Sequence, residues 1–173
     1  MGDIGIITSP HCKIKVINTM KYLGKVIGHV CELKEGLISP GDAIKLEIDT
    51  NYRKNLRIHH TATHILHAVL RDVLGRHVTQ KGSLVAQDKL RFDIGHPKAL
   101  TKAEIHLIES KVNSIISDNS KVNTKLMSTD QAIESGAVAL FGEKYDSEVR
   151  VVSLGADLNL SLIHISEPTR LRR

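Results

Sequence analysis

The stretch RIHHTATHILHAVLRDVLG, residues 57–75, contains four histidines within eleven positions of a pattern that predicts an α-helix. At about 100° per residue, His60, His64 and His67 fall on one line of this helix together with Arg71. Imidazoles at positions i and i+4 lie one turn apart and can bind the same Zn²⁺ ion. Because zinc takes four ligands, or three and a water molecule, this helix can supply only half of a zinc site.

The apolar side chains of the same helix fall on the opposite face, which must pack against the rest of the fold. They are Ala62, Ile65, Leu66, Val69 and Val73. The histidine line is therefore expected to face solvent or a cleft. A polar helix face can also carry histidines by chance, and the spacing alone leaves the two interpretations about equal. We expect His67 to be a surface residue or a neighbour of the site rather than a third ligand.

The segment before this helix predicts a small β module. Residues 1–50 contain three strand-like stretches separated by turn signals, CKIKVINTM, GKVIGHVCEL and AIKLEID. Short strands at this spacing predict a small antiparallel barrel or sheet.

After residue 50, helical and strand patterns alternate. The pattern predicts a helix over 57–74 that ends at Gly75, two strands within 77–95, a strand over 121–128, a short helix capped by Ser128 or Thr129, and a strand over 148–155. Residues 101–119 predict an amphipathic helix in which Thr101 and Glu104 form a capping box. Its apolar stripe would comprise Ile105, Ile108, Val112, Ile115 and Ile116. This order of elements predicts an α+β fold with helices on one face of a sheet.

The composition of the 173 residues limits the class of protein. Hydrophobic residues make up 41% and aromatic residues only 3%, so Ile, Leu, Val and Ala must build the core. No apolar run is long enough to cross a bilayer, and no signal peptide is evident. Cys12 and Cys31 form no close pair, which favours a reduced, cytoplasmic setting. The net charge of +5 is compatible with a nucleic-acid partner without establishing one.

Several longer motifs occur in an order that resembles the editing domain of alanyl-tRNA synthetase. HHTATHILHAVLR resembles the first metal-binding half-motif of that family, HVTQKGSLV and LRFDIGH the strands behind it, and GAVALFGEKYDSEVRVVSLG the run before the second half-motif. GDIGII and GLISPGDAIKLEIDTNYRKNLRIHH resemble the β-barrel that precedes this domain. The resemblance covers residues 1 to about 157. It implies a small antiparallel β-barrel module over 1–50 and a two-layer α/β editing domain, common to threonyl and alanyl synthetases and here incomplete, over 51–159.

The resemblance implies a proofreading function in protein biosynthesis. The reaction would be the hydrolysis of tRNA(Ala) wrongly charged with serine or glycine, which a small apolar ligation pocket rejects poorly. By matching motif positions, His60 and His64 would bind Zn²⁺. Thr63 would sense the serine hydroxyl, and Gln80 would orient the substrate or water. Without the resemblance, Thr63 would be interpreted as packed within its helix and Gln80 as an exposed strand residue.

The implied partner is the acceptor end of tRNA(Ala). Arg57, Arg71 and Lys81 are candidate phosphate contacts, although a solvated charge explains each of them equally well. No membrane partner and no obligate protein partner is expected. Aminoacylation, with its ATP, Mg²⁺ and alanine, would reside in the catalytic domain of the parent ligase, whose motifs this chain lacks.

The resemblance ends where the site should close. In the family, a loop with a cysteine and a histidine four residues later supplies the other two zinc ligands after the VRVVS strand. Here no cysteine follows Cys31, and LSLIHISEPTR, residues 160–170, resembles a translated sequencing adapter. We therefore expect a non-native tail over 160–173 and no ligand role for His164. Because half of the ligands are missing, the chain as written should bind zinc weakly and edit poorly.

Three hypotheses stay open at this point. The chain is an internal fragment of an alanyl-tRNA synthetase, a free-standing trans-editing hydrolase related to it, or a non-catalytic RNA-binding domain with an incidental histidine face. The start at MGDIGII and the long QKGSLVAQDKLRFD match favour the first over the second. Zinc content would separate the third from the other two.

Overall fold

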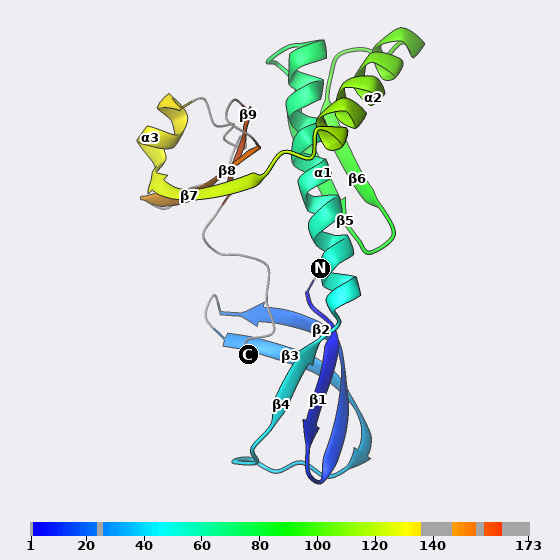
Figure 1. Ribbon diagram of the computed structural model, residues 1–173, viewed down its shortest axis with the longest axis vertical. Coiled ribbons are helices and arrows are strands. Elements are labelled where there is room, and N and C mark those ends of the chain that lie inside the picture. The colour runs from blue at the N-terminus through cyan, green and yellow to red at the C-terminus, as the bar shows by residue number, and fades with distance from the viewer. Residues whose placement is uncertain (1, 24–25, 136–146, 155–157, 164–173) are drawn as a thin grey trace. The chain divides into compact units, whose positions relative to one another are not determined.

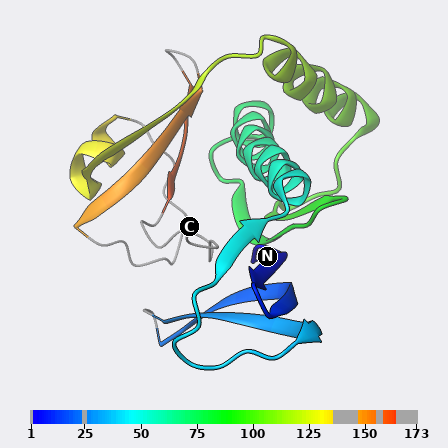
Figure 2. The same ribbon diagram turned by 60° about the horizontal axis from the view of Figure 1, so that its bottom comes forward.

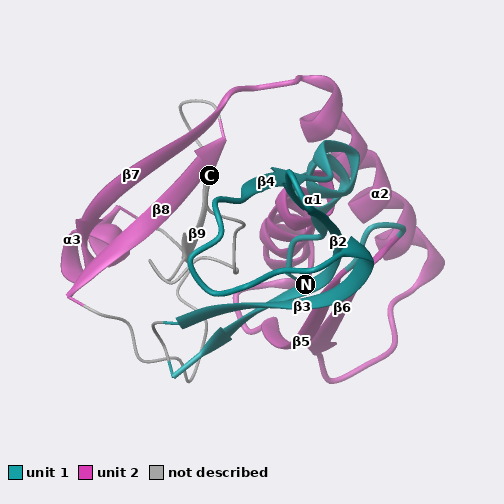
Figure 3. Ribbon diagram, turned by 90° about the horizontal axis from the view of Figure 1, so that it is seen from below, with its two compact units in different colours: residues 1–57, 86–88, 167–173 teal, residues 58–85, 89–166 magenta. Residues whose placement is uncertain are grey.

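The computed structural model describes residues 2–23, 26–135 and 147–154, and the backbone alone of residues 158–163. The chain divides into two compact units (Figure 3). Unit 1 holds residues 1–57 with 86–88, and unit 2 holds residues 58–85 with 89–166. Helix α1, Thr50–Leu74, begins in unit 1 and continues in unit 2. The histidine line of the candidate site therefore belongs to unit 2.

Unit 1 is built on a four-stranded antiparallel sheet of order β3-β2-β1-β4. Its strands are β1 (Gly5–Ser9), β2 (Cys12–Tyr22), β3 (Val26–Gly36) and β4 (Lys45–Ile48). Because alternate side chains of a strand point to the same face, the apolar residues of this sheet gather on one side. They form a core of Ile7, Cys12, Ile14 and Val16, against which Leu46 and Ile48 pack.

The antiparallel strands predicted for residues 1–50 are thus present, but in the described residues the sheet is not closed into a barrel. β3 and β4 lie at the two edges of the sheet and do not pair with each other. The sequence prediction also missed β1, because its five residues, GIITS, show no clear alternation of apolar and polar side chains.

Helix α1 begins at Thr50, about two turns before the predicted start at residue 57. Asp49 caps its first turn, since its side chain accepts from the Tyr52 amide (2.9 Å) and its carbonyl accepts from the Arg53 amide (3.0 Å). The Arg53 guanidinium donates in turn to both carboxylate oxygens of the buried Asp3. The apolar periodicity could not reveal this first turn, because Tyr52 and Leu56 are the only apolar side chains in residues 50–56.

In unit 2, α1 lies beside a hairpin and a second helix (Figure 1 and Figure 2). The hairpin consists of β5 (Thr79–Val85) and β6 (Leu90–Gly95), and the helix is α2 (Lys102–Ser117). A three-stranded antiparallel sheet of order β7-β8-β9 and one short helix complete the described part of this unit. They are β7 (Val122–Ser128), α3 (Thr129–Glu134), β8 (Glu148–Leu154) and β9 (Leu158–Ile163).

One hydrophobic cluster joins the elements around α1. Its buried members come from α1, α2, β8 and the residue before β5: Ile65, Val69, Leu70, Val78, Ile108, Val152 and Leu154. Phe92 and Ile94 of β6 pack against this cluster. Since α1 has neighbours in a hairpin, a helix and a second sheet, it buries more than the single stripe that the helical wheel predicts.

The predicted helix ends are confirmed. Gly75 follows α1 with φ +112°, a conformation that favours glycine, and its amide donates to the Arg71 carbonyl (3.1 Å). Thr101 and Glu104 form the predicted capping box of α2. Ser128, one of the two predicted candidates, caps α3.

The α+β class is confirmed at the level of mixed helices and antiparallel strands, but the arrangement of the sheets differs from the prediction. The strands of unit 2 described by the structure form two separate sheets, not one. The predicted stripe of α2 is only partly buried, because Ile108 lies in the core whereas Ile105 and Ile116 are 41% and 49% exposed. Within the described residues, no helix has both the length and the apolar character needed to cross a membrane.

Candidate functional site

His60 and His64 lie one turn apart on α1, and their rings meet at their Nε2 atoms. The Nε2–Nε2 distance is 3.2 Å, the ring centroids are 4.6 Å apart, and the ring planes are inclined by 61°. The helix spacing brings the two rings to the same side, as predicted from positions i and i+4. His60 is exposed and His64 half-buried, so the pair is accessible from solvent.

A second histidine pair shows what is particular about this geometry. His77 Nε2 and His96 Nδ1 are 3.0 Å apart, at the end of the β5–β6 hairpin where Thr79 pairs with Gly95. Their centroids are 5.2 Å apart and their planes differ by only 24°. The two nitrogens therefore point at each other along the line between nearly coplanar rings, which is the arrangement of an N–H···N hydrogen bond.

In the His60–His64 pair the nitrogens do not lie on the line between the rings. Their centroids are closer by 0.6 Å (4.6 against 5.2 Å), although their nitrogens are farther apart (3.2 against 3.0 Å). The Nε2–Nε2 contact of this pair is therefore more bent than the contact between His77 and His96, although both pairs lie within hydrogen-bonding distance. Two neutral imidazoles arranged in this way can offer their lone pairs to a single cation.

The surroundings favour the neutral form of both rings. Partial burial lowers the pKa of His64 to about 4, and the neighbouring His60 and His67 add to this effect. Desolvation by the surrounding protein also lowers the pKa of His60, and the positive charge of Arg150 acts in the same direction. Because only the deprotonated nitrogen binds a metal, both rings are in their ligand-competent state at neutral pH.

His67 was predicted to be either a surface residue or a neighbour of the site. The first of these predictions is wrong, because His67 is buried. It is 4% exposed, its ring contacts Phe92 with the centroids 5.2 Å apart, and its Nε2 is buried without a hydrogen-bond partner. Burial lowers its pKa, as does Arg71, whereas a hydrogen bond with the Val78 backbone opposes the shift. The helical wheel placed His67 opposite the apolar face, but the hairpin covers this side of α1 as well.

Thr63 and Gln80 have local hydrogen bonds in the structure. Thr63 is buried, and its hydroxyl donates to the His59 carbonyl one turn earlier (2.8 Å). Gln80 is half-buried on β5, and its Nε2 donates to the Ser83 hydroxyl (3.3 Å). These bonds use one donor of each side chain and leave the Thr63 oxygen lone pairs and the Gln80 carbonyl oxygen as acceptors.

The three basic candidates differ in their surroundings. Arg57 and Lys81 are exposed. Arg71 is half-buried, and its Nη1 donates to the Val78 carbonyl (3.1 Å), which ties the end of α1 to the segment before β5. Arg71 therefore already has a structural role in unit 2.

Arg150, whose positive charge acts on His60, is not among the residues predicted for the site. Arg150 lies on β8 between the buried Val149 and Val151. The alternation of EVRVVSL along a strand could have indicated which face Arg150 shares, but not that this face is directed to α1. That information comes from the packing of β8 against α1.

A third or fourth ligand is not found in the part of the chain that the structure describes. No three His, Cys, Asp or Glu side chains gather there in a group that could hold a metal ion. His164 and residues 136–146 of the GAVALFGEKYDSEVRVVSLG motif lie outside the described residues. The predicted tail, 160–173, begins within β9, whose backbone pairs with β8.

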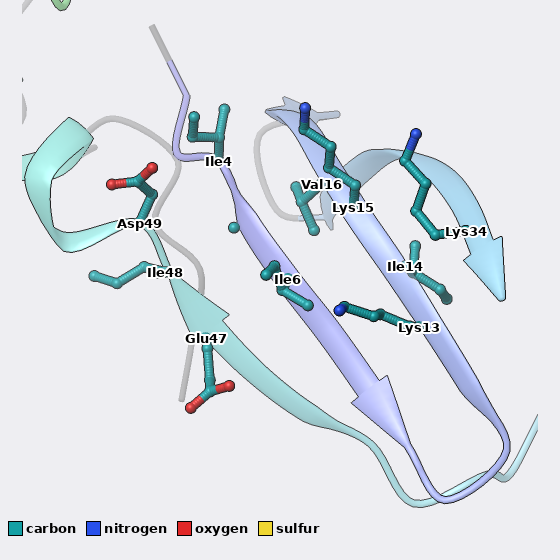
Figure 4. Close-up of a pocket in the computed structure, with 11 residues that line it drawn as sticks. Ile4, Ile6, Lys13, Ile14, Lys15, Val16, Lys34, Glu47, Ile48 and Asp49 are labelled. Carbon is teal, nitrogen blue, oxygen red and sulfur yellow. The ribbon is translucent and has the colours of Figure 1, made fainter.

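A separate groove lies on the sheet of unit 1 (Figure 4). Its volume is about 360 Å³, and it is lined by Ile4, Ile6, Lys13, Lys15, Lys34, Glu47 and neighbouring residues. Two of its charges are already in exposed ion pairs, Lys34 with Glu32 (2.5 Å) and Glu47 with Lys45 (2.9 Å). None of the residues predicted for the candidate site lines this groove.

Comparison with known proteins shows what most of the chain is similar to. No family model matches the chain. Curated alanine–tRNA ligases do match it, with 63% identity for the protein of Rickettsia bellii (strain RML369-C), 64% for Rickettsia felis (strain ATCC VR-1525 / URRWXCal2) and 61% for Rickettsia canadensis (strain McKiel). Each match covers 155 residues, which is 90% of this chain but only 18% of the relative.

These relatives carry the name of an aminoacyl-tRNA ligase, and the chain spans less than a fifth of their length. The matched length of 155 residues is close to the extent of the motif resemblance. With about 63% identity over nine-tenths of its length, the chain matches a fragment of alanyl-tRNA synthetase.

Proposed function

We propose that this chain is the proofreading part of an alanine–tRNA ligase, which hydrolyses tRNA(Ala) charged with serine or glycine. The observation that carries the proposal is the contact between the His60 and His64 Nε2 atoms, 3.2 Å apart, on the accessible side of α1. In this proposal, residues 1–50 of unit 1 are the small β module, residues 51–159 the incomplete editing domain, and 160–173 a non-native tail. Ligation, with ATP, Mg²⁺ and alanine, belongs to the remainder of the parent enzyme.

The two imidazoles fit Zn²⁺. Tetrahedral zinc with Zn–N bonds of ordinary length requires ligand nitrogens about 3.3 Å apart, close to the separation in this chain. The neutral state favoured for both rings is also the state that a metal needs. His60 and His64 would hold the ion, together with the cysteine and histidine that the family supplies after the VRVVS strand. Bound zinc would polarise a substrate group or orient the aminoacylated tRNA terminus.

Thr63 and Gln80 would contribute to the discrimination of serine from alanine. Thr63 lies between His60 and His64 in sequence, and its hydroxyl oxygen can still accept a hydrogen bond from the serine hydroxyl. Gln80 can accept a hydrogen bond through its side-chain carbonyl and so orient the substrate or the attacking water. The aminoacyl ester is already activated, so a positioned water and a stabilised oxyanion suffice for hydrolysis.

The proposed partner is the acceptor end of tRNA(Ala). The exposed Arg57 and Lys81 are the stronger candidates for phosphate contacts. Arg71 would act mainly through its hydrogen bond to the Val78 carbonyl. We propose a cytoplasmic location, where this substrate is found, and no further obligate partner.

The test is a deacylation assay on Ser-tRNA(Ala) and correctly charged Ala-tRNA(Ala). Two proteins are compared: the chain as it stands, and an extended protein in which residues 160–173 are replaced by the segment that follows the matched stretch in the Rickettsia bellii relative. The extended protein should release serine much faster than alanine, and His60→Ala should abolish this. A non-catalytic RNA-binding domain would bind the tRNA without hydrolysis in either form, and this result would refute the proposal.

A further inference from the structure

Arg150 shares a strand face with residues that pack on α1. Along β8, Val149 and Val151 belong to a small core with Ala132 and Met127, whereas Val152 and Leu154 belong to the cluster around α1. Because alternate residues of a strand share a face, Arg150 lies on the same face as Val152 and Leu154. Arg150 is therefore on the face of β8 that packs against the hydrophobic cluster around α1.

Along this face of β8, Arg150 is the residue that lies near the His60–His64 pair. Val152 and Leu154 pack in the cluster that contains Ile65 and Val69 of α1. Arg150, the next residue on the same face of β8, is half-buried and interacts electrostatically with His60, just over one turn before Ile65. The guanidinium and the His60–His64 pair therefore lie near each other in unit 2, although they are about 90 positions apart in sequence.

A cationic side chain beside a pair of metal-binding imidazoles is useful when the ligand is an anion. A guanidinium stays charged at all physiological pH values and can donate two parallel hydrogen bonds to a phosphate. A metal ion on the histidines would add positive charge to the same place. The two positive centres would then attract a negatively charged group to the space beside His60.

We propose that Arg150 binds the last phosphate of the tRNA 3′ end and thereby positions the aminoacyl ester beside His60 and His64. This inference rests on the proposed function, because it assigns the anion to the tRNA substrate. Arg150 is a positioning residue in this account. It acts on binding of the terminal nucleotide and not on the zinc affinity of the histidine pair.

The experiment measures binding of an acceptor-stem hairpin of tRNA(Ala) with a single-stranded CCA end. The 3′ end carries serine in a non-hydrolysable amide linkage, and the 5′ end carries a fluorophore for anisotropy. The full chain is compared with Arg150→Gln, Arg150→Lys and Arg91→Gln, which removes an exposed arginine of β6 as a matched control. A second hairpin lacks the terminal adenosine and its phosphate.

Arg150→Gln should raise the Kd for the complete hairpin about tenfold, since hydrogen bonds to charged groups are the stronger ones. It should also lower the slope of log Kd against log salt by about 1. Arg150→Lys should show a smaller loss of affinity, because the charge is kept and the paired hydrogen bonds are lost. For the truncated hairpin the wild type and Arg150→Gln should bind alike, a result that a merely structural role would not produce.

Equal affinity of the wild type and Arg150→Gln for the complete hairpin would overturn the inference, as would an equal loss for both hairpins. If Arg150→Gln does not fold, judged by circular dichroism, the comparison of Arg150→Lys with the wild type on the two hairpins decides in the same way. Zinc binding by His60 and His64 is measured separately, so this inference can fail while the proposed metal site stands. A wild-type chain that binds neither hairpin would contradict the proposed function itself.

Discussion

His60 and His64 differ from His77 and His96 in the direction in which their ring nitrogens point. The first pair lies one turn apart on α1, and its rings meet edge to face with their planes inclined by 61°. The second pair joins the two ends of a hairpin, and its nitrogens face each other in nearly coplanar rings. A short distance between two imidazoles is therefore not sufficient to indicate a metal site, and the ring orientation has to be considered as well.

The lowered pKa of His64 predicts a stability that falls in mild acid. His64 titrates near pH 4 when folded and near 6.5 when unfolded, so between these values the unfolded chain binds more protons. The free energy of unfolding should thus be constant above pH 7 with respect to this group and should decrease as the pH falls from about 6.5 to about 4.

Urea denaturation at several pH values in the presence of a chelator tests this prediction. His64→Gln removes the titrating group at a similar size, so its stability should decline less steeply over the same pH range. Parallel declines for the wild type and His64→Gln would show that His64 is not desolvated in the folded chain.

At the scale of single elements, the capping box of α2 is the clearest local device. Thr101→Ala removes the side-chain oxygen that accepts from the Glu104 amide (3.2 Å) and should lower the free energy of unfolding by about 1 kcal/mol. Ser110→Ala, in the exposed middle of the same helix, is the matched control and should be neutral or slightly stabilising. Equal destabilisation by both changes in a urea titration would argue against the cap.

The first turn of α1 depends on an ion pair that joins distant segments. Asp3 and Arg53 have side chains only 4% and 20% exposed, and loss of one partner leaves a charge in a poorly solvated place. Asp3→Ala should lower the free energy of unfolding by roughly 3 kcal/mol.

The control for this prediction is Glu32→Ala, which breaks an exposed pair with Lys34 on the sheet of unit 1. Exposed pairs contribute little, so this variant should keep the urea midpoint of the wild type. If Asp3→Ala also kept that midpoint, the buried pair would not be needed for the start of α1.

The elements that the sequence predicts well are those with local signals. Gly75, Thr101 and Ser128 mark helix ends through their own backbone or side-chain chemistry, and the structure confirms all three. The start of α1 was missed because residues 50–56 have few apolar side chains, and the Asp3–Arg53 ion pair of its first turn joins positions far apart in the sequence. Local sequence patterns also could not predict the number of sheets in unit 2, because strands pair with partners that are distant in the sequence.

The candidate site shows the same division. The i,i+4 spacing predicts that His60 and His64 meet, and their Nε2 atoms lie 3.2 Å apart. The burial of His67 was not predictable from a wheel, because the β5–β6 hairpin packs on a side of α1 that the apolar pattern leaves polar. The approach of Arg150 likewise depends on how β8 packs against α1.

At the scale of the whole molecule, the chain corresponds to 18% of its alanine–tRNA ligase relatives. The proposed editing reaction would be completed by groups that lie elsewhere in the parent enzyme. For that reason the extended protein should surpass the chain as it stands both in zinc affinity and in release of serine from Ser-tRNA(Ala). Equal activity of the two proteins would show that the cysteine- and histidine-containing segment is not part of the site.

The central claim is that His60 and His64 are two ligands of one metal ion, and imidazole nitrogen NMR during a zinc titration tests it most directly. Zinc should shift the Nε2 resonances of His60 and His64 together and leave the nitrogens of His77 and His96 unchanged, so the second pair serves as an internal control. His60→Ala should remove the shift of His64. The claim would be contradicted if zinc left His60 and His64 unaffected, or shifted the His77–His96 pair to the same extent.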